Sequence, residues 1–248
     1  MSAQPAISTE ALGKRFGDAG PLVLDDITLR IEPGEFVCLL GASGCGKSTL
    51  LNIIAGLERP TTGSVTVASG SAAVMFQDAA LFPWLSARRN VELALRLRGV
   101  PRELRRSQAL ELLDLVSLAD AADRRPHELS GGMRQRVALA RSLAQDRPVL
   151  LMDEPFAALD AITRDLLHEE LELVWRRTGR TIVFVTHNVR EAARLGQRVL
   201  LMSTRPGRIA NEWRVTDTGN RRIESPEVSR LAIEITDHLR KEIRRNAA

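Results

Sequence analysis

The chain has 248 residues, of which 44% are hydrophobic and 27% are charged; 35 lysines and arginines against 31 acids give a modest net charge of +4. These values are typical of a folded globular protein of one or two domains with a well-buried core. They exclude a chain that crosses a bilayer by itself, because no run of about 18 uncharged apolar residues occurs.

Three further features of the composition limit the class of protein. The N-terminal stretch MSAQPAISTEAL is too polar for a signal peptide, so we expect a cytosolic chain. Nucleic-acid binding is disfavoured because aromatic stacking platforms are scarce: the chain has no Tyr, 6 Phe and 3 Trp. The two cysteines, Cys38 and Cys45, match no zinc pattern, and a disulfide is not expected in the cytosol.

The first third of the chain predicts mostly β-strands. Val, Ile and Thr are dense in runs that turn sequences such as EPGE separate, and these runs cover 22–31, 35–40, 63–69 and 72–77. A helix is expected at 48–57, directly after a glycine-rich loop.

The remainder alternates between helical and strand patterns. From about Ser86 to Gln145 apolar residues recur at helical spacing, as in PRELRRSQALELLDLV. Three short apolar runs then suit buried parallel strands, at 148–155, 181–187 and 198–203. Helices are expected at 162–175 and 226–243. The order predicts an α/β core, an antiparallel β portion near the N-terminus and an inserted helical lobe.

Residues 41–49, GASGCGKST, fit the phosphate-binding loop pattern G-x-x-x-x-G-K-[ST]. The glycines let backbone N–H groups turn toward the phosphates, Lys47 brings a positive charge, and the Ser48 hydroxyl can bind Mg²⁺. A glycine-rich turn that merely contains Lys-Ser is disfavoured, because a strand precedes the pattern and a helix follows it. The predicted nucleotide-binding residues are Gly41, Ala42, Ser43, Gly44, Cys45, Gly46, Lys47, Ser48 and Thr49.

Acidic and polar residues follow the other strands. Asp153, at the end of a buried strand, can hold Mg²⁺, and its neighbour Glu154 is the candidate general base. His187 ends another strand and can hydrogen-bond the γ-phosphate or the attacking water. The Gln77 amide is a second such candidate and can also contact Mg²⁺. Structural roles for these strand-end residues are the alternative, which the upstream phosphate-binding loop disfavours.

A second anion-binding pattern occurs in LSGGMRQR. Ser130 can cap a helix whose first N–H groups are left uncovered by Gly131 and Gly132. Taken alone, this pattern would be read as an N-cap followed by a flexible glycine pair.

The ordered set GASGCGKST, VMFQD, LSGGMRQR, VLLMDEP, FAALD and VTH resembles the ATP-binding subunit of ABC transporters over nearly the whole chain, with Met133 replacing a common Gln. The resemblance implies a RecA-like P-loop NTPase core with an N-terminal antiparallel β subdomain and an inserted helical subdomain. It also implies an ATP-binding domain at 5–240 that contains the helical subdomain at 86–146, and a C-terminal helix at 225–246 packed on the core.

The resemblance also implies a homodimer that binds ATP and Mg²⁺ and hydrolyses ATP. Two subunits meet head to tail, so that Ser130, Gly131 and Gly132 of one contact the ATP held by the other. Phe16 stands where an aromatic ring stacks on adenine, and Asp160 where a residue contacts the partner's site. Magnesium is assigned to Ser48, Gln77 and Asp153, and catalysis to Glu154, His187 and Gln77.

Three stretches, at 80–101, 154–164 and 200–209, resemble the nitrate, sulfonate and taurine importer branch of the family. This implies membrane permease subunits as direct partners, a periplasmic or lipid-anchored solute-binding protein as an indirect one, and a peripheral location on the cytoplasmic face of the inner membrane. Phe82, Trp84 and Leu85 either contact the permease or pack within the helical lobe. Sulfonate-type compounds, which include taurine, are favoured as solutes; nitrate, related small organic anions and thiamine precursors are left open.

The sequence disfavours two rival functions. ABC proteins of DNA repair or translation usually carry tandem cassettes, coiled-coil inserts or basic linkers, which are not found here. A regulator that binds nucleotide without hydrolysing it is disfavoured because Glu154 and His187 are both present.

Overall fold

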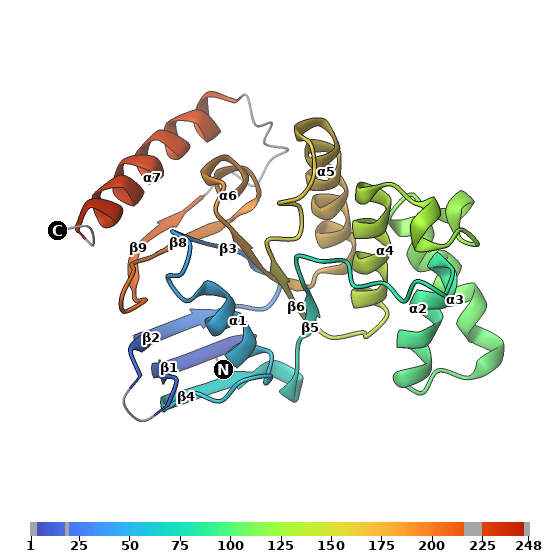
Figure 1. Cartoon of the computed structure of the whole chain (residues 1–248), viewed down its shortest axis with the longest axis horizontal. Coiled ribbons are helices and arrows are strands. Elements are labelled where there is room, and N and C mark those ends of the chain that lie inside the picture. Colours follow the sequence, from blue (N-terminus) through green and yellow to red (C-terminus); the bar gives the residue numbers. More distant parts are fainter. Residues whose placement is uncertain (1–3, 18–19, 216–224, 246–248) are drawn as a thin grey trace.

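The computed structural model describes residues 4–17, 20–215 and 225–245 (Figure 1). Their strands form two sheets, one of three strands in the order β2-β1-β4 and one of six in the order β5-β6-β7-β3-β8-β9. Helices cover the larger sheet, and a helical lobe projects from one end of the molecule.

The smaller sheet is antiparallel. Strand β1 (Ile7–Arg15) pairs with β2 (Leu22–Ile31) on one side and with β4 (Thr62–Val67) on the other. The sequence did not predict β1. Its pairing with β2 shifts register between Thr9 and Leu12, where Ala11 has a left-handed φ of 45°, and this bulge breaks the alternation that marks a strand.

The larger sheet is parallel except at one edge. It contains β5 (Ala73–Met75), β6 (Val149–Asp153), β7 (Thr181–Thr186), β3 (Phe36–Gly41), β8 (Arg198–Met202) and the antiparallel β9 (Ile209–Arg214). Every residue of β3, β7 and β8 is buried, as expected for parallel strands covered on both faces. The sequence patterns did not predict β9. It is an edge strand whose residues alternate between exposed and half-buried.

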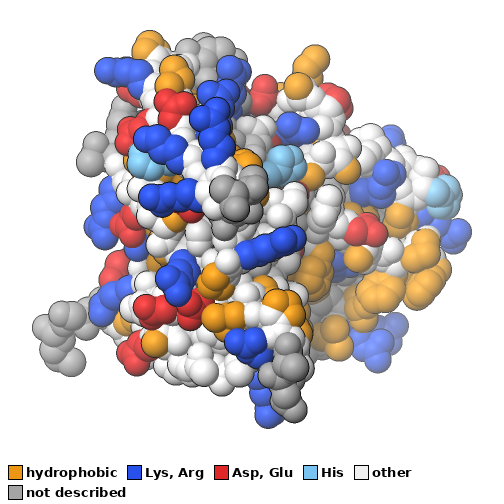
Figure 2. Space-filling model, turned by 60° about the vertical axis from the view of Figure 1, so that its left-hand side comes forward, with side chains coloured by type: hydrophobic (Ala, Val, Ile, Leu, Met, Phe, Trp, Pro, Cys, Tyr) orange, Lys and Arg blue, Asp and Glu red, His pale blue; other side chains and the backbone are white. Residues whose placement is uncertain are grey.

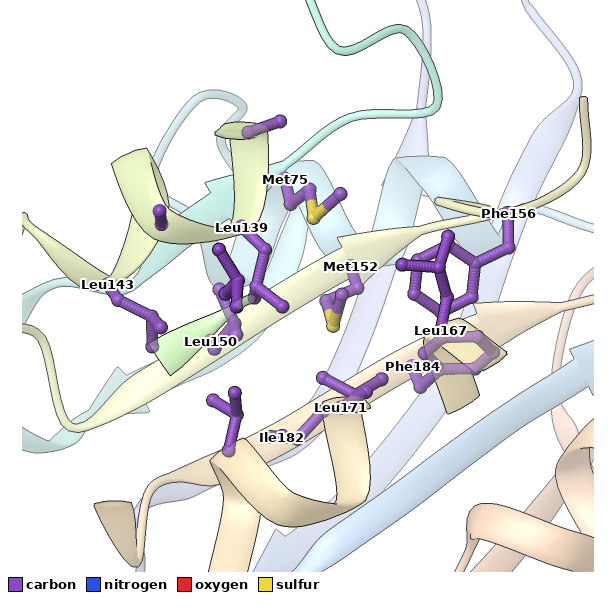
Figure 3. Close-up of a cluster of buried hydrophobic side chains, with 14 of the residues drawn as sticks. Met75, Leu139, Leu143, Leu150, Met152, Phe156, Leu167, Leu171, Ile182 and Phe184 are labelled. Carbon is purple, nitrogen blue, oxygen red and sulfur yellow. The ribbon is translucent and has the colours of Figure 1, made fainter. Parts of the chain in front are cut away.

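Two apolar cores lie on the two faces of this sheet. One contains residues of α1 (Lys47–Ile54) and the smaller sheet. The other joins the sheet to α4 (Gly131–Leu143) and α5 (Ala161–Thr178). Figure 3 shows part of this second core, where side chains from α4, α5, three strands and the segment after β6 meet: Met75, Leu139, Leu143, Leu150, Met152, Phe156, Leu167, Leu171, Ile182 and Phe184. This packing fixes the beginnings of α4 and α5 relative to the strand ends.

The lobe consists mainly of α2 (Ala87–Leu97) and α3 (Arg102–Leu115), which pack on each other and on α4 (Figure 1). Short 3-10 turns complete the chain path at Ala68–Gly70, Ala119–Ala121 and Pro126–Glu128. The short helix α6 (Val189–Leu195) follows β7.

The last helix, α7 (Pro226–Arg245), packs on α6 through its buried face of Val228, Ala232 and Ile235. Position 246, the end of the helix range predicted from the sequence, lies outside the described residues. On the side of the molecule shown in Figure 2, Lys and Arg side chains are interspersed with Asp and Glu. Within the described ranges, no helix has both the length and the apolar character that a membrane span requires.

Candidate nucleotide-binding and hydrolysis site

The phosphate-binding loop joins β3, which ends at Gly41, to α1, which begins at Lys47. Gly44 and Gly46 have φ angles of 78° and 99°, a left-handed conformation that L side chains rarely adopt. A Cβ on Gly46 would also lie 2.7 Å from Leu24 Cδ2. The Lys47 ammonium is buried inside the turn and donates to the carbonyls of Gly41 at 2.8 Å and Ala42 at 3.2 Å. The backbone of the loop therefore encloses the Lys47 ammonium group.

A turn between β8 and β9 supports this loop from outside. Gly207 donates to the Val23 carbonyl at 2.9 Å and accepts from the Asp25 amide at 3.0 Å. A Cβ at this position would lie 2.2 Å from the Cys45 carbonyl oxygen, so only glycine permits the approach. The Pro-Gly dipeptide at 206–207 indicates a turn, but nothing in the sequence indicates its contact with the loop.

Cys45 is buried within the loop. Burial raises the pKa of its thiol, and the nearby Lys47 ammonium, 3.9 Å from Sγ, only partly opposes this effect. Since the thiolate is the reactive form, we expect Cys45 to be a poor nucleophile.

Asp153 ends β6, and its carboxyl lies near the Ser48 side chain at the start of α1. Burial raises the pKa of this carboxyl; Ser48 and Lys47 oppose the rise, and the charge of Glu154 adds to it. A partly buried carboxylate beside a hydroxyl is a donor set that suits a hard divalent cation. Within the described part of the chain, no cluster of three or more His, Cys, Asp or Glu forms a closed metal site. A cation here would therefore also need ligands from phosphate oxygens or water.

Glu154 points away from Asp153 and toward His187. Its φ is 45°, and its amide donates to the Val185 carbonyl of the neighbouring strand at 3.0 Å. The carboxylate Oε2 then lies 3.0 Å from His187 Nδ1, and the imidazole is largely exposed. A carboxylate oriented by an imidazole at the carboxyl end of a parallel sheet is well placed to accept a proton.

Gln77 follows β5, and its side chain is exposed. Its carbonyl accepts from Gln135 Nε2 of α4 at 2.8 Å, and Arg141 of the same helix donates to the carbonyls of Ala79 and Ala80 at 2.7 Å. The segment after β5 is thus fastened to α4. Gln135 lies within the GGMRQR pattern, but spacing alone did not indicate this contact.

Phe16 directly follows β1, and the residue is 49% exposed. The Lys14 ammonium lies over one face, 4.7 Å from the ring centroid. Stacking on a base therefore requires the other face of the ring.

Ser130, Gly131, Gly132 and Asp160 form a second cluster, here called the helix-tip cluster. Ser130 caps α4 by accepting from the Met133 amide at 3.2 Å, and Asp160 caps α5 by accepting from the Thr163 amide at 3.0 Å. The Thr163 hydrogen bonds hold the pKa of the Asp160 carboxyl below its usual value.

The two helix tips touch because the glycines lack side chains. A Cβ on Gly131 would lie 3.2 Å from Leu159 Cδ2, and one on Gly132 would lie 2.6 Å from Thr163 Cγ2. In Figure 1, α4 lies well apart from α1. Among the described residues, no hydrogen bond or ion pair joins the helix-tip cluster to residues 41–49. One chain thus has two separate candidate anion-binding surfaces.

A phosphate-binding loop, cation-suited oxygens and a carboxylate–imidazole pair at neighbouring strand ends define a P-loop ATPase. Residues 24–157 match the ABC transporter family. The chain belongs to that family, and the structural comparison confirms the predicted α/β P-loop fold and the predicted ATP-hydrolysing class.

Two relatives and one solved structure illustrate the similarity. The chain is 48% identical over 212 residues to the nitrate import ATP-binding protein NrtD of Synechocystis sp., covering 82% of this chain and 80% of that protein. It is 44% identical over 237 residues to the taurine import ATP-binding protein TauB of Chromobacterium violaceum, covering 90% and 91%. The dimeric ATP-binding cassette MJ0796, solved with ADP and Pi, is 34% identical with a TM-score of 0.72, covering 85% of this chain and 99% of that one.

Proposed function

We propose that this chain is the ATP-hydrolysing subunit of an importer for a small anion of the nitrate, taurine or aliphatic sulfonate type. The names of its relatives support the solute class. The observation that carries the activity is the convergence of three features at neighbouring strand ends: the Lys47 loop, Asp153, and the Glu154–His187 pair. Adjacent carboxyl ends of parallel strands are where open α/β sheets bind their ligands.

Each residue near the loop has a distinct role in binding. Residues 41–49 hold the phosphates through backbone N–H groups and the α1 terminus, and Lys47 exchanges its carbonyl partners for phosphate oxygens. Phe16 stacks on adenine with its uncovered face. Ser48, Gln77 and Asp153 are the residues that would hold Mg²⁺, which neutralises phosphate charge when bound.

Glu154 acts as the general base for hydrolysis. The oxygen of a water attacks the γ-phosphorus, its proton passes to the Glu154 carboxylate, and the bond from phosphorus to the β–γ bridging oxygen breaks to release ADP. His187 orients the carboxylate through the 3.0 Å contact and is also placed to hydrogen-bond the γ-phosphate.

The helix-tip cluster serves the ATP of a second copy. Ser130, Gly131, Gly132 and Asp160 are not joined to their own loop, so one chain supplies half of each of two sites. A dimer that exchanges these halves about a two-fold axis completes both sites and leaves no further surface to fill. The dimeric state of the MJ0796 cassette supports this assembly.

The permease partner fits a groove of about 410 Å³ between the lobe and the sheet. Phe76, Phe82 and Leu97 are exposed apolar side chains in its lining, which Arg98 and Arg141 border. The side chain of buried Asn90 fixes the segment that precedes α2, because it donates to the carbonyls of Phe82, Leu85 and Ser86. Apolar and cationic side chains together suit a short amphipathic helix of a membrane subunit.

Of the three candidate permease contacts, only Phe82 lines this groove. Trp84 is 67% exposed and packs against Phe82 with ring centroids 5.5 Å apart, so it can extend the contact at the rim. Leu85 lines a separate hollow among arginines of α2 and α3. We therefore assign the primary contact to Phe82.

The remaining assignments follow from this partnership. Residues 5–240 act as the ATP-binding domain, with the helical subdomain at 86–146 presenting the groove and α7 within the C-terminal segment 225–246 packed on α6. The chain binds peripherally at the cytoplasmic face of the inner membrane, and a periplasmic or lipid-anchored solute-binding protein acts through the permease.

Co-expression with the permease subunits of a candidate nitrate- or taurine-type importer tests the importer assignment. We expect a complex that survives solubilisation and affinity purification, and Phe82→Ala should weaken it while leaving basal ATP hydrolysis intact. Leu173→Ala, an exposed apolar residue on α5, is the matched control and should not weaken it. Purification with ribosomes or DNA instead would favour an ABC ATPase that acts without a permease.

A mixing experiment tests the exchange of half-sites. Lys47→Ala and Ser130→Arg chains should each be inactive alone, but a mixed dimer contains one site with an intact loop and an intact helix tip. Mixing should therefore restore activity, up to about a quarter of the parental value for randomly paired, independent sites. Loss of ATP binding by the Ser130→Arg chain alone would contradict the assignment in trans.

A further inference from the structure

A buried carboxylate anchors the segment that carries His187. The Glu191 side chain on α6 is only 7% exposed, and it accepts a hydrogen bond of 2.6 Å from the Thr186 hydroxyl. The same hydroxyl accepts from the Asn188 amide at 2.9 Å, so both neighbours of His187 are held. Glu191 thereby fixes the backbone from which the imidazole projects.

An arginine on α5 anchors the segment that runs from Glu154 to Asp160. Arg164 donates to the Leu159 carbonyl at 2.6 Å and to the Phe156 carbonyl at 3.3 Å. Its Nε also lies 3.5 Å from Glu191 Oε1. One guanidinium therefore connects the segment after β6 to the segment after β7.

The contacts continue to the tip of α4. The Leu159 carbonyl is held by Arg164, and its side chain packs against Gly131. The Arg164–Glu191 pair thus connects two parts of the molecule. One part contains the hydrolytic residues Glu154 and His187, and the other is the helix-tip cluster proposed to contact the partner.

Among the basic side chains around Glu191, Arg164 is its main charge partner. His168 Nε2 lies 3.7 Å from Glu191 Oε1, but burial lowers the pKa of His168 to about 3, helped by the charges of Arg194 and Arg164, so the imidazole is neutral. Within the described ranges, no other Lys or Arg nitrogen lies within 4.0 Å of the Glu191 carboxylate. Arg194 faces Asp165 and Glu169 instead.

We propose that Arg164 and Glu191 form a positioning pair that links the chain's own Glu154–His187 pair to the helix-tip cluster it presents to the second subunit. This inference rests on the proposed roles of Glu154, His187 and the dimer. Closure of the partner on Asp160 and Ser130 then steadies the segment 154–160 and, through the pair, the segment that carries His187. The Glu154–His187 pair of each subunit is therefore ordered by contact with the other subunit, although the pair hydrolyses only the ATP bound to its own phosphate-binding loop.

The test uses two conservative variants, Arg164→Lys and Glu191→Gln. Lysine keeps the charge but cannot make the several directional contacts of a guanidinium, and glutamine keeps the shape of Glu191 without its charge. We expect kcat to fall about ten- to a hundredfold in each variant, as is typical when catalytic groups are misplaced by a fraction of an ångström to one ångström. The ATP affinity should stay within about twofold, since neither residue contacts the phosphate-binding loop.

The double variant separates a coupled pair from two independent residues. If Arg164 and Glu191 act as a unit, the double variant should have a kcat no lower than that of the worse single variant. Losses that multiply would overturn the proposal.

The chain offers a matched control in Arg136 and Glu170, an ion pair of 2.9 Å between α4 and α5 with side chains 19% and 16% exposed. Arg136→Lys and Glu170→Gln should change kcat by no more than about twofold, because the pair touches neither segment. An equal loss of kcat in the control pair would show that Arg164 and Glu191 contribute only to general stability, and it would refute the proposal.

Two further outcomes distinguish this inference from the proposed function. If Glu154→Gln abolishes turnover while Arg164→Lys hydrolyses ATP at the parental rate, the positioning pair alone is wrong. If Glu154→Gln itself hydrolyses ATP at the parental rate, the assignment of the base is wrong. Thermal unfolding of every variant checks that each remains folded.

Discussion

The Glu154 carboxylate and the His187 imidazole are 3.0 Å apart although 33 positions separate them in the chain. Parallel pairing places Asp153 opposite Val185, so β6 and β7 end side by side. The left-handed φ of Glu154 then turns its side chain toward His187 and leaves Asp153 facing Ser48. The two acids are adjacent in sequence but have different partners.

Removing the Glu154 charge should stop turnover without preventing binding. We expect Glu154→Gln to lower kcat at least about a hundredfold, the usual contribution of a general base, while ATP affinity is retained. ATP should then hold the variant as a dimer, which size-exclusion chromatography with light scattering will measure. Glu172→Gln, a change on α5 that removes the ion pair with Arg176, serves as the control. Hydrolysis at the parental rate by Glu154→Gln would exclude it as the base.

The raised pKa of Asp153 predicts opposite effects on stability and on cation binding. A carboxyl whose pKa is higher in the folded state stabilises the fold at low pH, and that stability is lost as the pH rises through the raised value. Without nucleotide, Asp153→Asn should therefore unfold at a higher temperature than the parent at pH 7.5. The same variant should lose the extra thermal stabilisation that Mg²⁺ adds to ATP. A variant less stable than the parent without ligand would contradict the burial argument.

The buried His168 predicts a loss of stability in mild acid. Its pKa is lowered to about 3, so the neutral imidazole is favoured in the folded state, and the stability present above the ordinary pKa is lost as the pH falls toward 3. The cost is about 1.4 kcal/mol for each pH unit below the ordinary value. Urea unfolding at pH 7.5 and 5.5 should show a smaller pH dependence for His168→Phe than for the parent. His127→Phe, at an exposed position, should behave like the parent.

The contact between α4 and α5 predicts a specific rescue. Gly132→Ala should lower the unfolding free energy by about 1–3 kcal/mol, as overpacking usually does, because the new Cβ meets Thr163 Cγ2. Thr163→Ser removes that methyl group, so adding it to Gly132→Ala should recover most of the loss. Chemical denaturation of the two single variants and the double variant measures this coupling. Strictly additive effects would show that the two positions are not in contact.

Much of the larger sheet follows from local sequence. The apolar runs at 35–40, 148–155, 181–187 and 198–203 correspond to β3, β6, β7 and β8, since strands buried on both faces need little else to identify them. The predicted strand 72–77 shortens to β5, Ala73–Met75, because Phe76 and Gln77 are exposed and leave the sheet. The helix predicted at 48–57 ends at Ile54, before Gly56 adopts a left-handed φ of 75°.

The candidate site was predictable where one short segment carries its own pattern, as in residues 41–49. Contacts between distant segments were not: Gly207 reaches Cys45, and Arg164 reaches Glu191, through the tertiary fold. One local signal does exist for Glu191. Asn188 accepts from the Glu191 amide, as an N-cap side chain does with the amide three positions further along the helix. That pattern locates the start of α6, but not the arginine that Glu191 faces.

The two carbonyls that hold the Lys47 ammonium have a kinetic consequence. In the proposed binding mode a polyphosphate would meet a loop that is already formed, so binding would require Lys47 to change its acceptors but would not require the backbone to refold. The loop would then lose little conformational entropy when the nucleotide binds, which favours rapid nucleotide binding in each cycle. In that binding mode discrimination among nucleotides would depend on contacts with the base and with the second subunit, because the loop would contact only the phosphates, which all nucleoside triphosphates share.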